Sequence, residues 1–362
     1  MIVQFLQRYT AEFFAIYRRL CGRFGRWLRA SPRLSGWFYA PLPELHPDAA
    51  YRGFNGWYFA QWDEQERMLA DGPRMAFYDA VIKRHIQPGD RVIDLGTGTG
   101  ILAALASRRG ASAVYALDHS EILEDARLLA EYNGIQNTEF IAKHSTDFHV
   151  AEPVDVILHE QIGDYLFDEA MVANVCDLRD RMLKPGGLIL PSQFEFFCEP
   201  VTLQNERHVP FIWEMNVMGY NYACLESKKP DNPEYYRQAS CDLGVVKAFL
   251  GEPAPSLNID LHTVTENTIP REVSIERRVT RAGPLHGLAV YFRTAIDDDL
   301  VLTSDPLDPG RAPHWGFRIL RTAHADPQVG DVITIKLTVG RWSDPDTWQW
   351  DYQVSGPASN LG

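Results

Sequence analysis

Residues 92–100 read Val92-Ile93-Asp94-Leu95-Gly96-Thr97-Gly98-Thr99-Gly100. The hydrophobic first half predicts a buried strand, and the apolar pattern of residues 99–109 predicts a helix directly after it. Glycines in such a turn let the backbone bend sharply and approach a ligand closely. A strand, a glycine-rich turn and a helix in this order predict a nucleotide-cofactor site in an α/β fold.

Residues 60–86 look helical, and from 91 to 198 strands and helices alternate, a pattern typical of a doubly wound parallel sheet. The expected helices are 60–86, 99–109, 120–132 and 168–183, and the expected strands are 91–95, 113–118, 140–142, 154–159 and 188–190, the last after a turn at 184–187. After Pro191, short β-branched and aromatic runs indicate an antiparallel barrel or sandwich, with a helical period only around 213–222. The predicted fold class is α/β, in three parts: a basic amphipathic helix and linker (1–50), a cofactor domain (51–191) and a β-barrel domain (192–362).

The charge of the chain is uneven. The formal net charge is −13, yet residues 1–35 carry seven arginines and one glutamate, so this segment is +6 and the remaining residues sum to −19. An acidic body disfavours nucleic-acid binding and attracts cationic substrates. Five cysteines without C-x-x-C spacing indicate reduced thiols and no metal-ligand cluster stands out, so we expect a cytoplasmic protein without a bound metal.

Residues 2–28 place apolar side chains at a helical period with arginines between them. Three interpretations stay open: a helix docked on the body or on a partner, a peripheral membrane helix formed by residues 1–30, and an organellar transit peptide. The prolines between residues 32 and 43 then indicate a linker. No stretch of the sequence is long and apolar enough to suggest a membrane-spanning helix.

Acidic residues around the glycine turn indicate the chemistry of the cofactor. Asp94 precedes Gly96, Gly98 and Gly100, and Asp118 ends the next expected strand, where a carboxylate can accept both ribose hydroxyls. A carboxylate beside the turn is unfavourable for a diphosphate but suits a ligand with an ammonium and a sulfonium group. We therefore expect S-adenosyl-L-methionine, with a nicotinamide cofactor as the alternative.

Two glutamates, Glu160 and Glu169, flank a short loop after the expected strand 154–159. Nine residues is not a same-face helical spacing, so the loop must fold back if the two carboxylates meet. Two adjacent carboxylates repel each other and need a cation between them. A substrate guanidinium fits, because its planar fork offers two edges for bidentate hydrogen bonds.

Over roughly residues 55–355 the sequence resembles the protein arginine methyltransferases. The segments His159-Glu160-Gln161-Ile162-Gly163 and Glu169-Ala170-Met171 are similar to the family's double-glutamate loop, and Pro313-His314-Trp315 is similar to its Thr-His-Trp loop. The sequence departs from the family's residues at His159, Gln161, Ile162 and Pro313. The resemblance implies a methyltransferase domain, then a β-barrel with a helical dimerisation arm, here around residues 213–240, and hence a homodimer.

The resemblance also implies roles for single residues. The residues implied to bind the cofactor are Met68, Arg74, Asp94, Gly96, Gly98, Gly100 and Asp118, with Arg74 on its methionine carboxylate. The residues implied to be catalytic are Glu160, Glu169, His314 and Asp71, with Asp71 paired to His314 as the route for the departing proton. The residues implied to contact the substrate are Tyr58, His159 and Trp315, and for His159 a role in capping the strand end is the alternative.

The predicted activity is methyl transfer from S-adenosyl-L-methionine to an arginine guanidinium nitrogen of a protein or peptide. Two alternatives stay open. The first is the same chemistry on a small guanidine, a natural-product peptide or another nitrogen nucleophile. The second is a non-catalytic, methyltransferase-like scaffold subunit.

Overall fold

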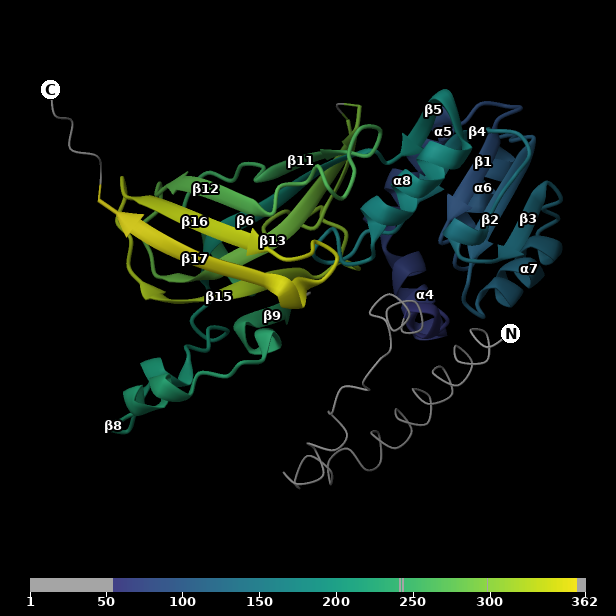
Figure 1. Cartoon of the computed structure of the whole chain (residues 1–362). Helices are drawn as coiled ribbons and strands as arrows, with labels where there is room; N and C mark the ends of the chain where they lie inside the picture. Colours follow the sequence, from purple (N-terminus) through teal and green to yellow (C-terminus); the bar gives the residue numbers. More distant parts are fainter. Residues whose placement is uncertain (1–54, 241, 243, 298, 357–362) are drawn as a thin grey trace, which may run out of the picture.

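The computed structural model describes residues 55–240, 242, 244–297 and 299–356. Figure 1 shows two lobes, an α/β domain and an antiparallel β domain, joined by a short connection. The basic helix and linker predicted for residues 1–50 lie outside the described residues. No helix in the described part of the chain is long and apolar enough to cross a membrane.

The first lobe is a five-stranded parallel sheet in the order β3-β2-β1-β4-β5. Its strands are β1 (Arg91–Leu95), β2 (Ala113–Asp118), β3 (Thr138–Ala142), β4 (Val154–His159) and β5 (Leu183–Leu190). Its helices are α4 (Trp62–Ala70), α5 (Gly72–His85), α6 (Ile101–Arg108), α7 (Leu123–Tyr132) and α8 (Met171–Met182). The strand order reverses between β1 and β4, and ligands bind at the carboxyl ends of the strands around such a reversal.

Two boundaries in this lobe differ from the sequence prediction. The single helix expected over 60–86 is two helices, because Asp71 has an extended backbone and caps α5 by accepting a hydrogen bond from the Arg74 amide at 2.9 Å. The turn expected at 184–187 belongs to β5, which is irregular against β4 and contains Gly186 at a φ of 75°.

The second lobe begins at β6 (Gln193–Leu203), which lies in a seven-stranded antiparallel sheet along the path β10-β6-β13-β15-β9. The other strands of this sheet are β9 (Arg237–Ser240), β10 (Val246–Phe249), β11 (Leu257–Asp260), β13 (Leu285–Ile296), β14 (Leu300–Thr303) and β15 (Phe317–Ala325). A second sheet contains β12 (Glu272–Arg278), β16 (Val332–Val339) and β17 (Trp348–Ser355). Alternate residues of β16 are fully buried, as expected where one face of a sheet covers a core. The predicted α/β class with an antiparallel second domain is confirmed.

An arm extends from the second lobe between β6 and β9 (Figure 1). It contains the 3-10 helices η2 (Ile212–Glu214), η3 (Ala223–Lys228) and η4 (Pro233–Tyr236) and a hairpin of β7 (Asn216–Val217) and β8 (Tyr220–Asn221). The helical period expected around 213–222 is thus realised as 3-10 turns and a hairpin. The reason is local, because Met218 and Gly219 both have positive φ and close the two-residue turn that pairs β7 with β8.

One hydrophobic core continues through both lobes, and the loop between β4 and α8 carries it across. Phe167 of this loop contacts Phe196 and Trp342 of the second lobe, at ring-centroid distances of 5.8 and 4.7 Å. Aromatic side chains bury large apolar areas, so these contacts fix the loop between the two lobes.

Candidate active site

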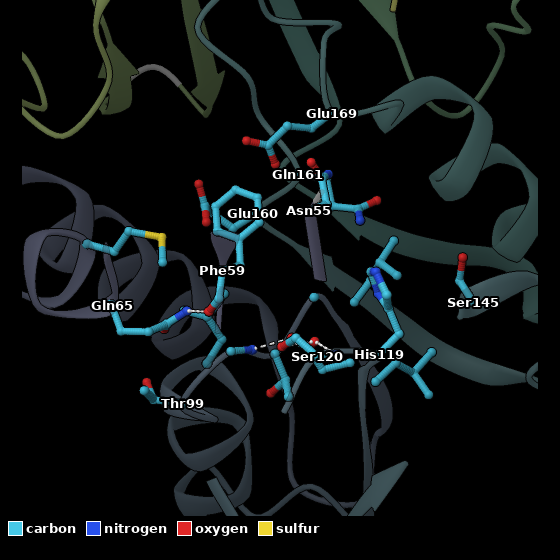
Figure 2. A pocket seen from close by; sticks show the side chains of 18 of the residues that line it. Asn55, Phe59, Gln65, Thr99, His119, Ser120, Ser145, Glu160, Gln161 and Glu169 are labelled. Carbon is cyan, nitrogen blue, oxygen red and sulfur yellow. Dashed lines mark hydrogen bonds between the residues drawn. The ribbon is translucent and has the colours of Figure 1, made fainter. Parts of the chain in front are cut away.

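A pocket opens at the carboxyl ends of β1, β2 and β4 (Figure 2). Its walls come from residues 55–74, the glycine turn, the ends of β2 and β3, and the loop that follows β4. The predicted site residues that line it are Met68, Arg74, Gly96, Gly98, Asp118, Glu160 and Glu169. The predicted site residues that do not line it are Tyr58, Asp71, Asp94, Gly100, His159, His314 and Trp315.

Asp94 organises the glycine turn from behind. Its side chain is fully buried and accepts hydrogen bonds from the Thr97 hydroxyl at 2.5 Å and the Ala103 amide at 2.9 Å. Burial raises the pKa of Asp94 to about 6, and these two donors oppose the rise. Asp94 therefore connects the turn to α6 and does not line the pocket, and its other oxygen, Oδ1, is buried without a hydrogen-bond partner among the described residues. The cofactor-binding role of Asp94 stays a prediction.

The amides of the turn are hydrogen-bonded within the protein. Those of Gly96 and Thr97 both donate to the Leu117 carbonyl at 2.9 Å, and that of Gly98 donates to Asp118 Oδ2 at 2.9 Å. In dinucleotide enzymes, amides of such a turn face the pyrophosphate. Because three of these donors are already used and carboxylates line the pocket, the site is a poor match for a diphosphate.

Asp118 is held rigidly at the end of β2. Besides the Gly98 amide on Oδ2, it accepts hydrogen bonds on Oδ1 from the amide and the hydroxyl of Ser120, at 2.8 and 2.7 Å. A carboxylate offers about four acceptor positions, so an acceptor site remains for a ribose hydroxyl. The three protein donors fix the direction in which that acceptor points.

Arg74 and Glu160 form a buried ion pair at the base of the pocket. The distance from Arg74 Nη2 to Glu160 Oε2 is 3.0 Å, and their side chains are 6% and 11% exposed. Arg74 Nη1 also donates to the Met68 carbonyl at 3.0 Å. Burial raises the pKa of Glu160, and the charge of Arg74 opposes the rise. The pair therefore joins the start of α5 to the end of β4.

Glu169 lies beside Glu160 at the pocket, and Figure 2 shows both carboxylates from the loop after β4. The pKa of Glu169 is raised well above its usual range, first by burial and then by the negative charge of Glu160. The loop folds back through an antiparallel bridge between Gly163 and Leu166. A Cβ on Gly163 would lie 2.0 Å from an Asp168 oxygen, so a larger residue there would displace the Asp168 carboxylate, which accepts a hydrogen bond from the Tyr165 amide. The nine-residue spacing thus brings two half-buried carboxylates to one pocket.

Trp315 holds this loop from the second lobe. The Trp315 indole N–H donates to the Ile162 carbonyl, and the Gly316 amide donates to Asp164 Oδ1 at 2.9 Å. The side chain of Trp315 is 2% exposed and does not line the pocket. The substrate contact predicted for Trp315 is therefore replaced by a positioning role for the loop that carries Glu160 and Glu169.

His159 ends β4 inside the core and does not line the pocket. Its side chain is fully buried, and Nε2 lies 2.7 Å from the Pro191 carbonyl oxygen, so Nε2 carries the proton of the neutral ring. Burial lowers the pKa of His159 to about 4. The substrate contact predicted for His159 is replaced by the alternative, a structural contact at the strand end.

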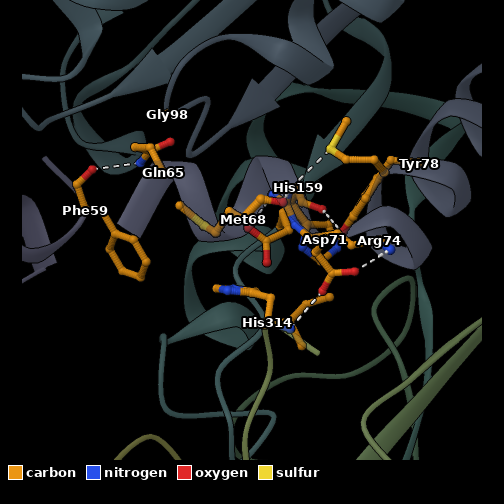
Figure 3. Close-up of polar contacts among 12 residues, drawn as sticks. Phe59, Gln65, Met68, Asp71, Arg74, Tyr78, Gly98, His159 and His314 are labelled. Atoms are coloured by element: carbon orange, nitrogen blue, oxygen red, sulfur yellow. Dashed lines mark hydrogen bonds and ion pairs between the residues drawn. The ribbon is translucent and has the colours of Figure 1, made fainter. Parts of the chain in front are cut away.

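Asp71 and His314 are in contact, as Figure 3 shows, but through the His314 backbone. The His314 amide donates to Asp71 Oδ2 at 2.9 Å. Imidazole Nδ1 of His314 is buried and has no hydrogen-bond partner among the described residues. Burial, followed by the charges of Arg74 and Arg67, lowers the pKa of His314 to about 3. A direct proton relay between the Asp71 carboxylate and the His314 ring is therefore absent from this part of the chain.

Tyr58 lies just outside the pocket, where its hydroxyl accepts a hydrogen bond from Arg67 at 3.0 Å. Burial is the main reason that its pKa is raised to about 12. The next residue, Phe59, lines the pocket, and its carbonyl accepts from the Gln65 side-chain amide at 2.7 Å. Gln65 was not predicted as a site residue. Gln65 could have been suspected only from its place on the helical face of Met68.

Among the described residues, no group of three or more His, Cys, Asp or Glu side chains is placed to hold a metal ion. The pocket therefore offers three carboxylates, two basic side chains, Arg74 and Lys143, and a glycine turn in which the amides of residues 96–98 are already hydrogen-bonded. This combination suits a ligand that carries both a carboxylate and positive charge.

The sequence of the chain is similar to those of several known proteins. Residues 77–192 match the family described as ribosomal protein L11 methyltransferase (PrmA). The chain is 30% identical to protein arginine N-methyltransferase 6 of Xenopus tropicalis over 261 residues, which cover 70% of this chain and 76% of that protein. It is also 30% identical to protein arginine N-methyltransferase PRMT10 of Oryza sativa subsp. japonica, over 76% of this chain and 80% of the relative.

The fold is similar to two solved structures. Protein arginine methyltransferase 10 of Arabidopsis thaliana, solved in an open conformation, has a TM-score of 0.70 at 23% identity and covers 84% of this chain and 96% of its own. The Trypanosoma brucei PRMT1 enzyme–prozyme heterotetrameric complex with AdoHcy has a TM-score of 0.69 at 21% identity, with 83% and 95% covered. At these identities the likeness concerns the fold alone.

Proposed function

The chain belongs to the protein arginine N-methyltransferase family, and we propose that it transfers a methyl group from S-adenosyl-L-methionine to an arginine guanidinium nitrogen of a protein or peptide. The observation that carries this proposal is the pair Glu160 and Glu169, two half-buried carboxylates that line one pocket. A guanidinium is the side chain that two carboxylates can bind along two edges at once.

The residues at the pocket fit the cofactor. When bound, S-adenosyl-L-methionine supplies an electrophilic methyl group on a sulfonium. Arg74 would bind its carboxylate, Asp118 a ribose hydroxyl, and the turn at Gly96 and Gly98 would lie against its backbone. The internally satisfied amides and the nearby carboxylates favour this cation over a dinucleotide.

The proposed work of the glutamate pair is electrostatic and geometric. Methyl transfer requires a guanidinium beside a sulfonium, and two carboxylates offset the repulsion between these cations in a desolvated pocket. The same hydrogen bonds orient one terminal nitrogen, so that a bimolecular reaction becomes effectively intramolecular. Because Arg74 already pairs with Glu160, Glu169 is the carboxyl group of the pair that is left for the substrate, and the charge of a bound guanidinium would favour its ionised form.

In the proposed reaction an N–C bond would form on the guanidine as the bond between the methyl carbon and the cofactor's sulfur breaks, which would leave a neutral thioether. The same guanidine must finally release a proton. Sequence resemblance suggested His314 with Asp71 as the acceptor. With its pKa lowered to about 3, His314 is a weak base, whereas the pKa of Glu169 is raised. We propose that Glu169 receives the proton and passes it to solvent.

The test is mass spectrometry of an arginine-containing peptide and of free arginine after incubation with the full chain and S-adenosyl-L-methionine. Methylated peptide supports the proposal, and its mass separates mono- from dimethylation. Label confined to the small guanidine would favour the small-molecule alternative. A protein that binds the cofactor but methylates neither would be a scaffold subunit.

We also propose that the protein forms a homodimer through the arm. Exposed apolar side chains gather on the arm at Val217, Met218 and Tyr220, 45%, 95% and 75% exposed, and on α7 at Leu128 and Tyr132, 65% and 89% exposed. Exposed apolar patches of this kind mark interfaces. Sedimentation equilibrium of the wild type and of Met218→Asp/Tyr220→Asp should show a dimer and a monomer; a wild-type monomer would exclude this assembly.

The remaining proposals concern the cellular location of the protein and its contact with a membrane or a partner. We propose a cytoplasmic protein that contacts a membrane or a partner through residues 1–30, and the support is the +6 charge and helical apolar period of that segment. Co-sedimentation with anionic vesicles, with and without residues 1–35, tests the membrane contact. Equal pelleting of both forms would exclude the membrane contact.

A further inference from the structure

Residues 160–169, the glutamate loop, contain strained backbone. Leu166 has a φ of 72°, and Ala170, which directly follows the loop, has a φ of 54°. A residue with a side chain is unfavourable in this left-handed region and stays there only when its surroundings hold it. The Trp315 indole holds the loop near its start. The strain at Leu166 requires a further contact in the middle of the loop.

Tyr165 supplies this second anchor. It is 6% exposed, and its ring lies edge-on to Trp348 with centroids 5.2 Å apart. Two guanidinium groups lie over the same ring, with the Cζ atoms of Arg318 and Arg237 at 5.4 and 5.9 Å from its centroid. A cation is attracted to an aromatic face, and more strongly where water is excluded. Three side chains of the second lobe therefore hold the residue next to Leu166.

Arg318 contacts the glutamate loop at two consecutive residues. It comes from β15, and besides lying over the Tyr165 ring it donates through Nη2 to Asp164 Oδ2. The other oxygen of Asp164, Oδ1, accepts the Gly316 amide at 2.9 Å. Both side chains of the ion pair are 25% exposed, so solvent screens the pair only partly. Arg318 thus compensates the charge of Asp164 and holds the adjacent ring.

Arg237 reaches the same ring from the end of the arm. It is the first residue of β9, the strand that follows η4 where the arm rejoins the second lobe (Figure 1). Its side chain is 11% exposed, and its Nη2 pairs with Asp346. Its Nε is buried and has no hydrogen-bond partner among the described residues. The guanidinium is therefore mostly removed from water where it meets the ring, which strengthens the contact.

The glutamate loop carries two further carboxyl groups, Asp164 and Asp168. Burial raises the pKa of Asp168 to about 6, and the negative charge of Asp164 adds to the rise. The charges of both also raise the pKa of Glu169, after burial and the charge of Glu160. Arg318 opposes the rise at Asp168 and pairs with Asp164. Its removal would leave uncompensated negative charge in a loop already rich in carboxyl groups.

We propose that Arg237 and Arg318 are positioning residues for the glutamate loop: they hold Tyr165 from the second lobe, and Tyr165 keeps the loop in the conformation that brings both glutamates to the pocket. Neither arginine lines the pocket, so both act through the loop. The inference rests on the proposed function for its effect on turnover. It adds two residues that affect the reaction without touching the reacting groups.

Hydrogen–deuterium exchange of the full chain, measured by mass spectrometry, tests the positioning without relying on activity. In Arg318→Leu and in Arg237→Leu, peptides covering residues 160–170 should exchange at least about tenfold faster than in the wild type, since a desolvated cation–π contact contributes roughly that factor. Peptides of β1 and β13 should keep wild-type exchange, which shows that the fold is intact. Unchanged exchange of the loop in both variants would overturn the proposal.

Arg293→Leu is the matched control. Arg293 lies on β13 of the same sheet as Arg237 and Arg318 and pairs with Glu195 on β6 at 2.8 Å, with 39% and 32% of the two side chains exposed. This variant loses a comparable ion pair but no contact to Tyr165, so loop exchange and kcat should equal those of the wild type. Equal acceleration of loop exchange in all three variants would show a general loosening and contradict the proposal.

Kinetics separate positioning from a general loss of structure. In Arg237→Leu, kcat for an arginine peptide should fall about tenfold, because misplaced glutamates no longer orient the guanidinium. The dissociation constant of S-adenosylhomocysteine, measured by calorimetry, should stay within about threefold of the wild type. Because Arg237 acts through Tyr165, Arg237→Leu should lower kcat by less than about twofold in a Tyr165→Leu background. Full additivity of the two changes, or a parallel loss of S-adenosylhomocysteine binding, would overturn the proposal.

The outcomes distinguish this inference from the proposed function. Peptide methylation by the wild type together with unchanged kcat in both arginine variants would refute the inference and leave the function standing. Faster loop exchange in the variants of a protein that methylates no peptide would refute the function and leave the two arginines as anchors of the loop.

Discussion

Asp71 Oδ2 accepts the His314 amide at 2.9 Å, while Asp71 Oδ1 accepts the Arg74 amide at the start of α5. One carboxylate therefore caps the helix that carries Arg74 and binds the β14–β15 connection of the other lobe. Both bonds involve backbone amides, so the role of Asp71 is to position the two lobes around the pocket.

Asp71→Ala should lower the free energy of unfolding by about 2–4 kcal/mol, because it removes a helix cap worth about 1 kcal/mol and leaves a partly buried amide without its acceptor. Urea unfolding measures the loss. Asp79→Ala is the control on the same helix: Asp79 is in an exposed pair with Lys83, and its loss should change stability by less than about 0.5 kcal/mol. Equal losses for the two variants would contradict the capping role.

Glu169→Gln should reduce kcat/KM for an arginine peptide at least 100-fold, because a charge-assisted bidentate contact is replaced by a neutral one. Affinity for S-adenosylhomocysteine should stay within about threefold of the wild type. Glu152→Gln is the matched control, an exposed glutamate outside the pocket, and should retain full activity. Near-normal turnover by Glu169→Gln would rule out the clamp.

Trp315→Phe should reduce kcat about tenfold and the free energy of unfolding by about 1–2 kcal/mol, because the Ile162 carbonyl loses its donor and the loop with both glutamates loosens. Trp350→Phe removes an indole bond to the Arg321 carbonyl, away from this loop. Trp350→Phe should lower the free energy of unfolding by a similar amount but leave kcat unchanged. The kcat difference between these variants, measured by initial rates, is the decisive quantity.

The pKa of His159 is lowered from 6.5 to about 4 in the folded protein. Between these two pH values the unfolded chain therefore binds more protons at this residue than the folded protein does. Falling pH therefore destabilises the fold through this residue, by about 3 kcal/mol in all between pH 7 and pH 4. His159→Gln lacks this titration. Its stability relative to wild type should thus improve by about that amount over the same interval, as measured by urea unfolding at each pH; a pH-independent difference would contradict the buried neutral ring.

The parallel sheet was predictable, because a strand that is buried on both faces has a continuous run of hydrophobic residues in its sequence. Val92 and Ile93, both fully buried, are an example. The pocket residues on the glycine turn and after β4 were predictable for the same reason: the strand ends place them. The family assignment, which rested on widely spaced motifs, is confirmed by the comparisons.

Side-chain directions were not predictable. Trp315 and Ile162 lie 153 residues apart, and nothing local shows that the indole turns toward a loop carbonyl and away from the substrate. The same holds for His159, whose partner is the Pro191 carbonyl.

The hydrophobic core that passes through Phe167 makes the two lobes one thermodynamic unit. Separating them would expose Phe167, Phe196 and Trp342 together, and neither lobe has its own sealed interior at this junction. Calorimetry should accordingly show a single cooperative transition, not one per lobe. A chain cut at residue 191 should yield fragments that aggregate when expressed alone, although each has the length of an independent domain.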